Sequence, residues 1–323
     1  MGSPLLSVLR NVSGARAKAQ AQGDDVTRVS VMVARDADVG LLRALREGFY
    51  PQTCGARVHV EAFGDADEPV ANALSDAAVI ACAGDAAPRG AGVAARLWRT
   101  YATAGVPAVV CARTTPAPKP GAVVAGAPRD AHPLRDALVA DGVSPDAIVT
   151  GEDPGRVVAH VGAWVVRALG DDEALAAATG FPCCREAQAR ALIGRAVRDN
   201  AVASLLGVLP GAQADRVALT TNQAVLALRV AKVYGHPVGA ERLREIVPII
   251  ASSRLWRRVA RALERRLPLP PVVVRALVAA AATAAEGATV HEALRGTATG
   301  ARDDAREPRP QTSRASRGRR SEA

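Results

Sequence analysis

The feature that most constrains the fold is a change of pattern near residue 170. Before this point, short apolar runs typical of strands alternate with segments of helical periodicity, and beyond it only the helical periodicity remains. Alternating strands and helices predict a mostly parallel sheet with helices on both faces. The sequence therefore predicts an α/β domain with three αβα layers, followed by an all-α domain.

Five runs carry the strand prediction: Arg28–Ala34, Arg57–Phe63, Ala77–Ala83, Val106–Ala112 and Ala147–Thr150. Most are continuous apolar runs, which favour strands buried on both faces, whereas the second alternates and predicts one wet face. The helices expected among these strands are Gly40–Gly48, Gly90–Ala104, Pro133–Asp141 and Gly155–Leu169.

The second half predicts helices at Glu173–Ala178, Arg185–Leu206, Asp215–Tyr234, Gly239–Ala251, Leu255–Leu267 and Pro271–Leu294. The helix from Asp215 to Tyr234 has the clearest boundaries, because Pro210-Gly211 precedes it and Gly235 and Pro237 follow it. We expect residues 1–25 to be a flexible leader, 26–170 the α/β domain, 171–298 the helical domain, and 299–323 a disordered basic tail.

Arginine dominates the charge of the chain, which has a formal net charge of +9. Residues 185–300 hold seventeen basic side chains against eight acidic ones, and only Lys18, Lys119 and Lys232 are lysines in the whole chain. Such a bias is typical of a GC-rich genome, and the alternative is a phosphate-binding surface. The five cysteines show no C-x-x-C spacing, which favours a reducing cytosol over a disulfide framework.

Membrane-directing segments are not evident in the sequence. The N-terminus lacks the apolar core of a signal peptide, and no uncharged apolar run reaches the roughly 18 residues that span a bilayer. The nearest run, Ala276–Ala285, is bounded by Arg275 and Glu286. These patterns predict a cytoplasmic protein.

The loop after the first expected strand has lost the chemistry of a phosphate site. A P-loop uses glycines to wrap the phosphates, a lysine to neutralise them and a hydroxyl to hold magnesium. Gly40 is in register with the second glycine, but leucines stand in place of the lysine and the hydroxyl, and two aspartates would repel phosphate. The residues of this vestigial phosphate loop are Arg35, Asp36, Asp38, Gly40, Leu41 and Leu42. The alternative is a plain turn between strand and helix.

From Arg28 to Leu169 the chain resembles a Ras-like (Era-type) GTPase domain. Arg57–Phe63 falls where such domains place an antiparallel edge strand. The segment 104–110 is similar to the strand that leads into the base-reading N-K-x-D motif, where Arg113-Thr114-Thr115 stands instead. The resemblance implies a Ras-like sheet with one antiparallel edge. The missing polar residues imply a pseudoenzyme with no catalytic residue, no cofactor and no metal.

Residues 181–294 resemble the helical domain of unknown function 697, which often follows GTPase domains and includes proteins associated with the inner membrane. The residues that carry this signature are Asn200, Pro210, Gly211, Asn222, Gln223, Tyr234 and Gly235. The family has no established activity, so the resemblance implies an association with membranes rather than a reaction.

A basic amphipathic helix is expected around residues 254–266. Its surface residues are Arg254, Trp256, Arg257, Arg258, Arg261 and Arg265. Arginines at helical spacing, with a tryptophan at the margin of the apolar face, are typical of a helix that lies on an anionic membrane surface. The alternatives are a solvated face of a helix bundle and a nucleic-acid-binding surface.

These patterns together favour a non-catalytic pseudo-GTPase of bacterial origin. We expect it to act as a scaffold or regulator for a protein partner, in the cytoplasm and peripherally at the inner membrane. Two alternative functions stay open: an NTPase with a non-standard phosphate site that uses Arg35 or Asp38, and a nucleic-acid-binding protein. Self-association into a homo-oligomer stays open as well.

Overall fold

The structure is a computed structural model that describes residues 26–64, 70–84, 88–114, 133–206, 214–236 and 253–306. For residues 88–89, 206, 214–221, 224, 253–255, 257 and 296–306 it describes the backbone alone. The expected leader, the turn at Pro210-Gly211 and the helix expected at Gly239–Ala251 lie outside the described residues.

The first half of the chain forms a five-stranded sheet in the order β2-β1-β3-β4-β5. Its strands are β1 (Thr27–Ala34), β2 (Ala56–Phe63), β3 (Ala77–Ala83), β4 (Ala108–Arg113) and β5 (Ile148–Gly151). All four neighbouring pairs run parallel. The α/β class and all five predicted strands are confirmed.

The prediction of an antiparallel edge strand at Arg57–Phe63 is wrong. β2 does lie at the edge of the sheet, but it pairs in parallel with β1 from Thr27↔Ala56 to Ala34↔Phe63. Helix α2 (Val39–Gly48) carries the chain back to the start of β1, so the next strand enters in the same direction. The alternating pattern predicts one wet face, but four successive residues of β2, His59 to Ala62, are exposed, so both faces of this edge strand are wet there. The pattern carries no information about the direction of the strand.

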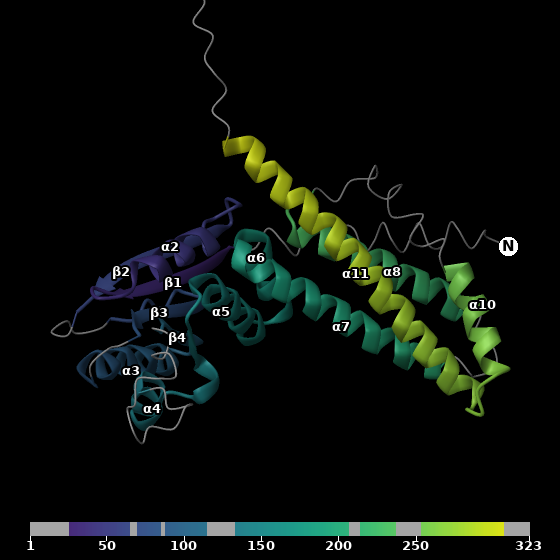
Figure 1. The fold of residues 1–323 in the computed structure, drawn as a ribbon, viewed down its shortest axis with the longest axis horizontal. Coiled ribbons are helices and arrows are strands. Elements are labelled where there is room, and N and C mark those ends of the chain that lie inside the picture. Colours follow the sequence, from purple (N-terminus) through teal and green to yellow (C-terminus); the bar gives the residue numbers. More distant parts are fainter. Residues whose placement is uncertain are drawn as a thin grey trace, which may run out of the picture.

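Helices cover both faces of the sheet (Figure 1). On one face α2 and α5 (Pro154–Ala168) pack over Val31 and Val79. On the other, α3 (Pro88–Thr103) and α4 (Pro133–Ala140) pack over Met32 and Ile80. Neighbouring residues of each strand enter opposite apolar clusters, as the two-residue period of a strand requires. A short 3-10 helix, η1 (Pro145–Ala147), leads into β5.

The second half is helical in its described residues. It contains α6 (Asp171–Gly180), α7 (Pro182–Leu206), α8 (Ala214–Val233), α10 (Ser253–Glu264) and α11 (Pro271–Arg306). α7, α8 and α11 form an elongated bundle, and α10 packs beside the start of α11 (Figure 1). α11 continues through residues 299–306, which were expected to belong to the tail. α10 ends before the predicted Leu267, because Pro268 and Pro270 follow.

The two halves share one apolar core across the expected boundary at residue 170. The cluster that contains β1 and α2 continues through Val161 and Phe181 to Leu228 on α8. α5 and α7 approach closely at Gly162, where an added Cβ would lie 2.2 Å from the backbone oxygen of Cys183. This contact fixes the helical bundle against the sheet.

Candidate functional site

The edge of the sheet where the strands end is the first candidate site. In this strand order the chain reverses its direction of winding between β1 and β3, and ligands of open α/β sheets bind beyond the carboxyl ends of the strands at such a point. The vestigial phosphate loop follows β1 at this edge.

Asp38 caps the N-terminus of α2. Its carboxylate accepts a hydrogen bond from the backbone N–H of Leu41 at 2.8 Å. This N–H, followed by the guanidinium of Arg113, holds the pKa of Asp38 below its ordinary value. The carboxylate therefore lies where the N-terminus of a helix would otherwise attract a phosphate.

Arg113, the last residue of β4, reaches across this edge of the sheet with its side chain. Its Nη1 donates to Asp38 at 3.1 Å and its Nε donates to the backbone oxygen of Glu152 at 3.0 Å. Gly84 follows the last residue of β3, and an added Cβ there would lie 1.6 Å from the backbone oxygen of Arg113. The absence of a side chain at Gly84 is what lets the chain after β4 pass this point.

The leucines of the vestigial phosphate loop turn away from the edge. Leu41 is fully buried, and Leu42 is half-buried against the core beneath α2. Arg35 and Asp36 are exposed. The loop lies between β1 and α2, as the sequence predicted, but Arg113 and Gly84 were not predicted to belong to this edge. The only sequence signal for Arg113 was a charged residue at the end of an apolar run.

A second constellation lies inside the helical bundle. Asn200 on α7 is fully buried and donates a hydrogen bond to the hydroxyl of Thr283 on α11 at 2.9 Å. Asn222 on α8 donates to the side-chain oxygen of Asn200 at 3.0 Å. Two of the signature residues thus join three helices through one polar chain.

Tyr234 lies at the end of α8 and bonds α11. Its hydroxyl is 3.0 Å from Nδ1 of His291, and the two ring centroids are 5.7 Å apart. Burial, and then the charge of Glu186, raises the pKa of Tyr234. Gly235 has φ of 77° and ends the helix, as expected of a glycine in this position. Gln223 is half-buried, and Pro210 and Gly211 lie outside the described residues.

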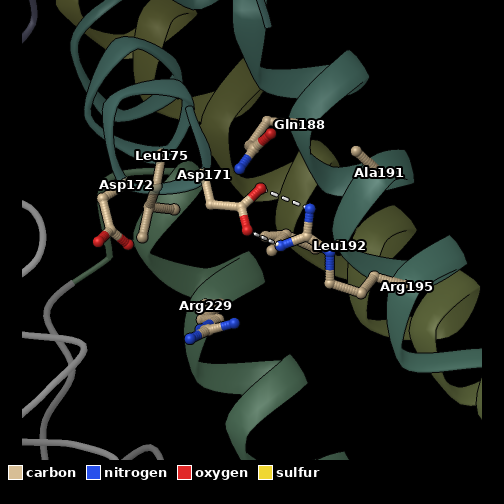
Figure 2. Close-up of a pocket in the computed structure, with 8 residues that line it drawn as sticks. All are labelled: Asp171, Asp172, Leu175, Gln188, Ala191, Leu192, Arg195 and Arg229. Atoms are coloured by element: carbon tan, nitrogen blue, oxygen red, sulfur yellow. Dashed lines mark hydrogen bonds and ion pairs between the residues drawn. The ribbon is translucent and has the colours of Figure 1, made fainter. Parts of the chain in front are cut away.

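The third candidate is a pocket between α6, α7 and α8, with a volume of about 340 Å³. It is lined by Asp171, Asp172, Leu175, Gln188, Ala191, Leu192, Arg195 and Arg229 (Figure 2). Both oxygens of Asp171 accept hydrogen bonds from Arg195, and this pair holds the pKa of Asp171 below its ordinary value. No residue of this pocket was singled out from the sequence as a site, because its side chains come from three separate helices.

The expected basic surface lies at the end of the bundle away from the sheet (Figure 1). Arg258, Arg261 and Arg265 are exposed and Trp256 is half-buried, while the side chains of Arg254 and Arg257 lie outside the described set. The turn after α10 and the start of α11 add four exposed apolar side chains that the sequence pattern did not indicate: Leu267, Leu269, Val273 and Leu277. We call residues 258–277 the distal tip.

α11 also bears on the membrane question. Its segment Pro271–Arg295 is long and apolar enough to cross a membrane by length and composition alone. The core helix of a soluble protein meets the same criteria, and this segment packs on α7 and α8. The sequence did not predict a membrane span here, because Arg275 and Glu286 bound the apolar run.

Metal and thiol chemistry find little support in the described part of the chain. No cluster of three or more His, Cys, Asp or Glu side chains there could hold a metal ion. Burial raises the pKa of Cys82 to about 12 and raises that of Cys111 further. Both thiols are therefore inert core groups at neutral pH.

Comparison with known proteins assigns no family: no family model, no curated protein and no solved structure matches the chain.

Proposed function

We propose that the chain is a non-catalytic scaffold or regulator, built on a degenerate Ras-like nucleotide-switch domain and held peripherally at the anionic cytoplasmic face of a membrane. The all-parallel sheet of the described residues departs from the Ras-like arrangement, which has one antiparallel edge strand. The proposal therefore rests on the phosphate loop, whose expected position lies between β1 and α2. The α/β domain supports the helical bundle rigidly and does not bind or hydrolyse a nucleotide.

The proposal that the protein is not a catalyst rests on the N-terminus of α2, which the carboxylate of Asp38 already occupies. A bound phosphate would have to displace the carboxylate of Asp38 from the Leu41 N–H and break its ion pair with Arg113. It would find no lysine or hydroxyl in exchange, since Leu41 and Leu42 point into the core. Helix dipole and arginine are thus already satisfied by a group of the protein itself.

Titration of the purified protein with fluorescently labelled GTP and ATP in the presence of Mg²⁺ tests this part. We expect no binding at micromolar nucleotide. Micromolar binding of either nucleotide would reject the proposal. Turnover that disappears in Arg35→Ala or Asp38→Ala would establish the alternative of an NTPase with a non-standard phosphate site.

The membrane part rests on the composition of the distal tip. Its apolar residues are 40% exposed at Leu267, 43% at Leu269 and 58% at Leu277, although most large apolar side chains of the described chain are buried. Arg258, Arg261, Arg265 and Arg266 flank them and are all exposed. An apolar cluster surrounded by arginines fits the boundary between acyl chains and anionic headgroups.

The backbone of the tip suits an apolar phase as well. Pro268, Pro270 and Pro271 have no N–H to leave without a partner. The N–H groups of Arg266 and Leu267 donate to the backbone oxygen of Leu263. Few backbone donors in this turn would therefore lose water on insertion.

Flotation with vesicles tests the membrane part. Wild-type protein should float with anionic vesicles and remain in the soluble fraction with zwitterionic ones. Arg265→Gln with Arg266→Gln should weaken binding about 10- to 30-fold, since each surface arginine contributes about 1 kcal/mol. Leu267→Ser with Leu269→Ser should also release the protein.

Matched controls come from the α/β half. Arg43→Gln removes an exposed arginine and Val139→Ser an exposed apolar side chain, and both should float like wild type. Protein that stays soluble with anionic vesicles at low salt would remove the membrane from the proposal. Salt-dependent binding to DNA that is lost with the tip arginines would instead support the nucleic-acid alternative.

A further inference from the structure

The side chains that line the pocket between α6, α7 and α8 include two polar ones from its interior, Gln188 and Arg229. Gln188, which is 4% exposed, lines the pocket with its amide. The Nε of Arg229 is buried and has no hydrogen-bond partner within the described chain. Both side chains line the same cavity (Figure 2). We propose that this cavity is a binding site for a small oxyanion, a carboxylate or a phosphate ester, centred on Arg229.

The ion pair between Asp171 and Arg195 explains why the Nε–H of Arg229 lacks an acceptor in the described structure. Asp171 already gives one carboxylate oxygen to each of two guanidinium nitrogens of Arg195. Arg229 acts on Asp171 only through its charge and forms no hydrogen bond with it in the described structure. Two arginines thus share one carboxylate, and the second guanidinium keeps its donors for another acceptor.

The chemistry of the lining selects the kind of ligand. A planar guanidinium offers parallel N–H groups that match the two oxygens of a carboxylate or phosphate, and the buried amide of Gln188 can add a further donor. Asp172 also lines the pocket, on the far side of Leu175 from the Asp171–Arg195 pair (Figure 2). A carboxylate at Asp172 limits the bound charge, which favours a small monoanion or dianion over a polyphosphate.

The size of the cavity and its apolar walls further restrict the choice of ligand. A volume of about 340 Å³ exceeds that of a bare ion, since one water occupies roughly 30 Å³ of liquid. Leu175, Ala191 and Leu192 provide apolar wall around the polar end. The cavity therefore fits an oxyanion that carries a few carbon atoms, and its anionic end would lie at Arg229.

Isothermal titration and thermal unfolding of the full chain test the site with three probes: inorganic phosphate, glycerol 3-phosphate and butyrate. Sodium chloride at equal ionic strength is the reference. We expect at least one probe to bind with a stoichiometry of one and to raise Tm by a few degrees, whereas chloride does not. If an organic probe binds more tightly than inorganic phosphate and raises Tm further, the apolar wall contacts the carbon atoms of the ligand.

Variants locate the effect. Arg229→Gln should weaken the binding of the effective probe at least about tenfold, and Arg229→Lys should weaken it less because the charge remains. Arg190→Gln is the matched control, since this arginine is exposed on the same helix as Arg195 and pairs with Glu186 outside the pocket. No response beyond that to chloride, or unchanged binding by Arg229→Gln, overturns the site and leaves a water-filled cavity.

A second variant guards against misfolding. Gln188→Leu replaces the buried amide by an apolar group of similar size, so the protein without ligand should keep or raise its Tm while the probe binds more weakly. An Arg229→Gln protein whose Tm falls by several degrees without any anion would show that the guanidinium holds the fold, and would contradict the proposal. Neither result bears on the distal tip, so this site and the proposed membrane contact fail independently.

Discussion

The two halves of the molecule treat polar groups in opposite ways. The sheet half keeps its charges at the rim, where Asp38 and Arg113 pair, and its interior is apolar apart from hydroxyls such as Ser30, which bonds Ser75. The bundle instead buries amides and an imidazole between its helices. Strand pairing already fixes the register of a sheet, whereas helices coated with alanine and valine can slide unless polar bonds fix their position.

The largest effect is expected where the halves meet. Gly162→Ala would place a Cβ 2.2 Å from the backbone oxygen of Cys183, and a backbone atom cannot move aside cheaply. We expect a loss of about 3 kcal/mol, seen as a fall in Tm of roughly 6–10 °C. Gly194→Ala is the control: it lies in an exposed stretch of α7 with open space around it, and should gain about 0.5–1 kcal/mol. Equal Tm values for both variants would contradict the tight junction.

The next effect concerns the buried amide of the bundle. Asn200→Ala removes the acceptor of Asn222 and the donor to Thr283 inside a closed core, at a cost of about 2–3 kcal/mol in the free energy of unfolding. Asn222→Ala, at an exposed position, should cost under about 1 kcal/mol. Urea denaturation of both variants measures their losses in the free energy of unfolding. Equal losses would mean that the bonds of Asn200 behave like those of a surface residue.

A smaller effect is expected at the rim of the sheet and should depend on pH. Because the pKa of Asp38 is lowered on folding, its contribution to stability is present above the pKa of the unfolded chain and is lost as the pH falls through the folded value. Asp38→Asn should lower Tm modestly near pH 6, and the difference from wild type should vanish below about pH 3. A difference that persists in acid would mean that geometry rather than charge matters.

The smallest effect compares one chemical change in both halves. Tyr234→Phe removes the bond to His291 and should cost about 1 kcal/mol. Tyr101, on α3 beneath the sheet, is fully buried, and its hydroxyl has no partner among the described residues, so Tyr101→Phe should leave Tm unchanged or slightly higher. If both variants lost the same free energy of unfolding, the proposed difference between the polar bonds of the bundle and the apolar interior of the sheet half would be wrong.

The candidate site could be predicted only in part. The absence of phosphate ligands at Leu41 and Leu42 is visible in the sequence, because a P-loop has fixed spacing. The partner that closes this edge, Arg113, lies 75 positions from Asp38, and no local pattern joins them. The pocket around Arg229 was missed for the same reason, since its lining belongs to three helices.

The sequence by itself determined the class and order of the elements. Periodicity and Pro/Gly boundaries act within a few residues, so all five strands and the helices of the described residues, apart from the end of α11, lie close to where they were expected. Only the tertiary structure decided the direction of β2, the approach of α5 to α7 at Gly162, and the convergence of Asn200, Asn222 and Thr283. These depend on which surfaces meet across the core, and that choice is set by packing between distant segments rather than by any local pattern.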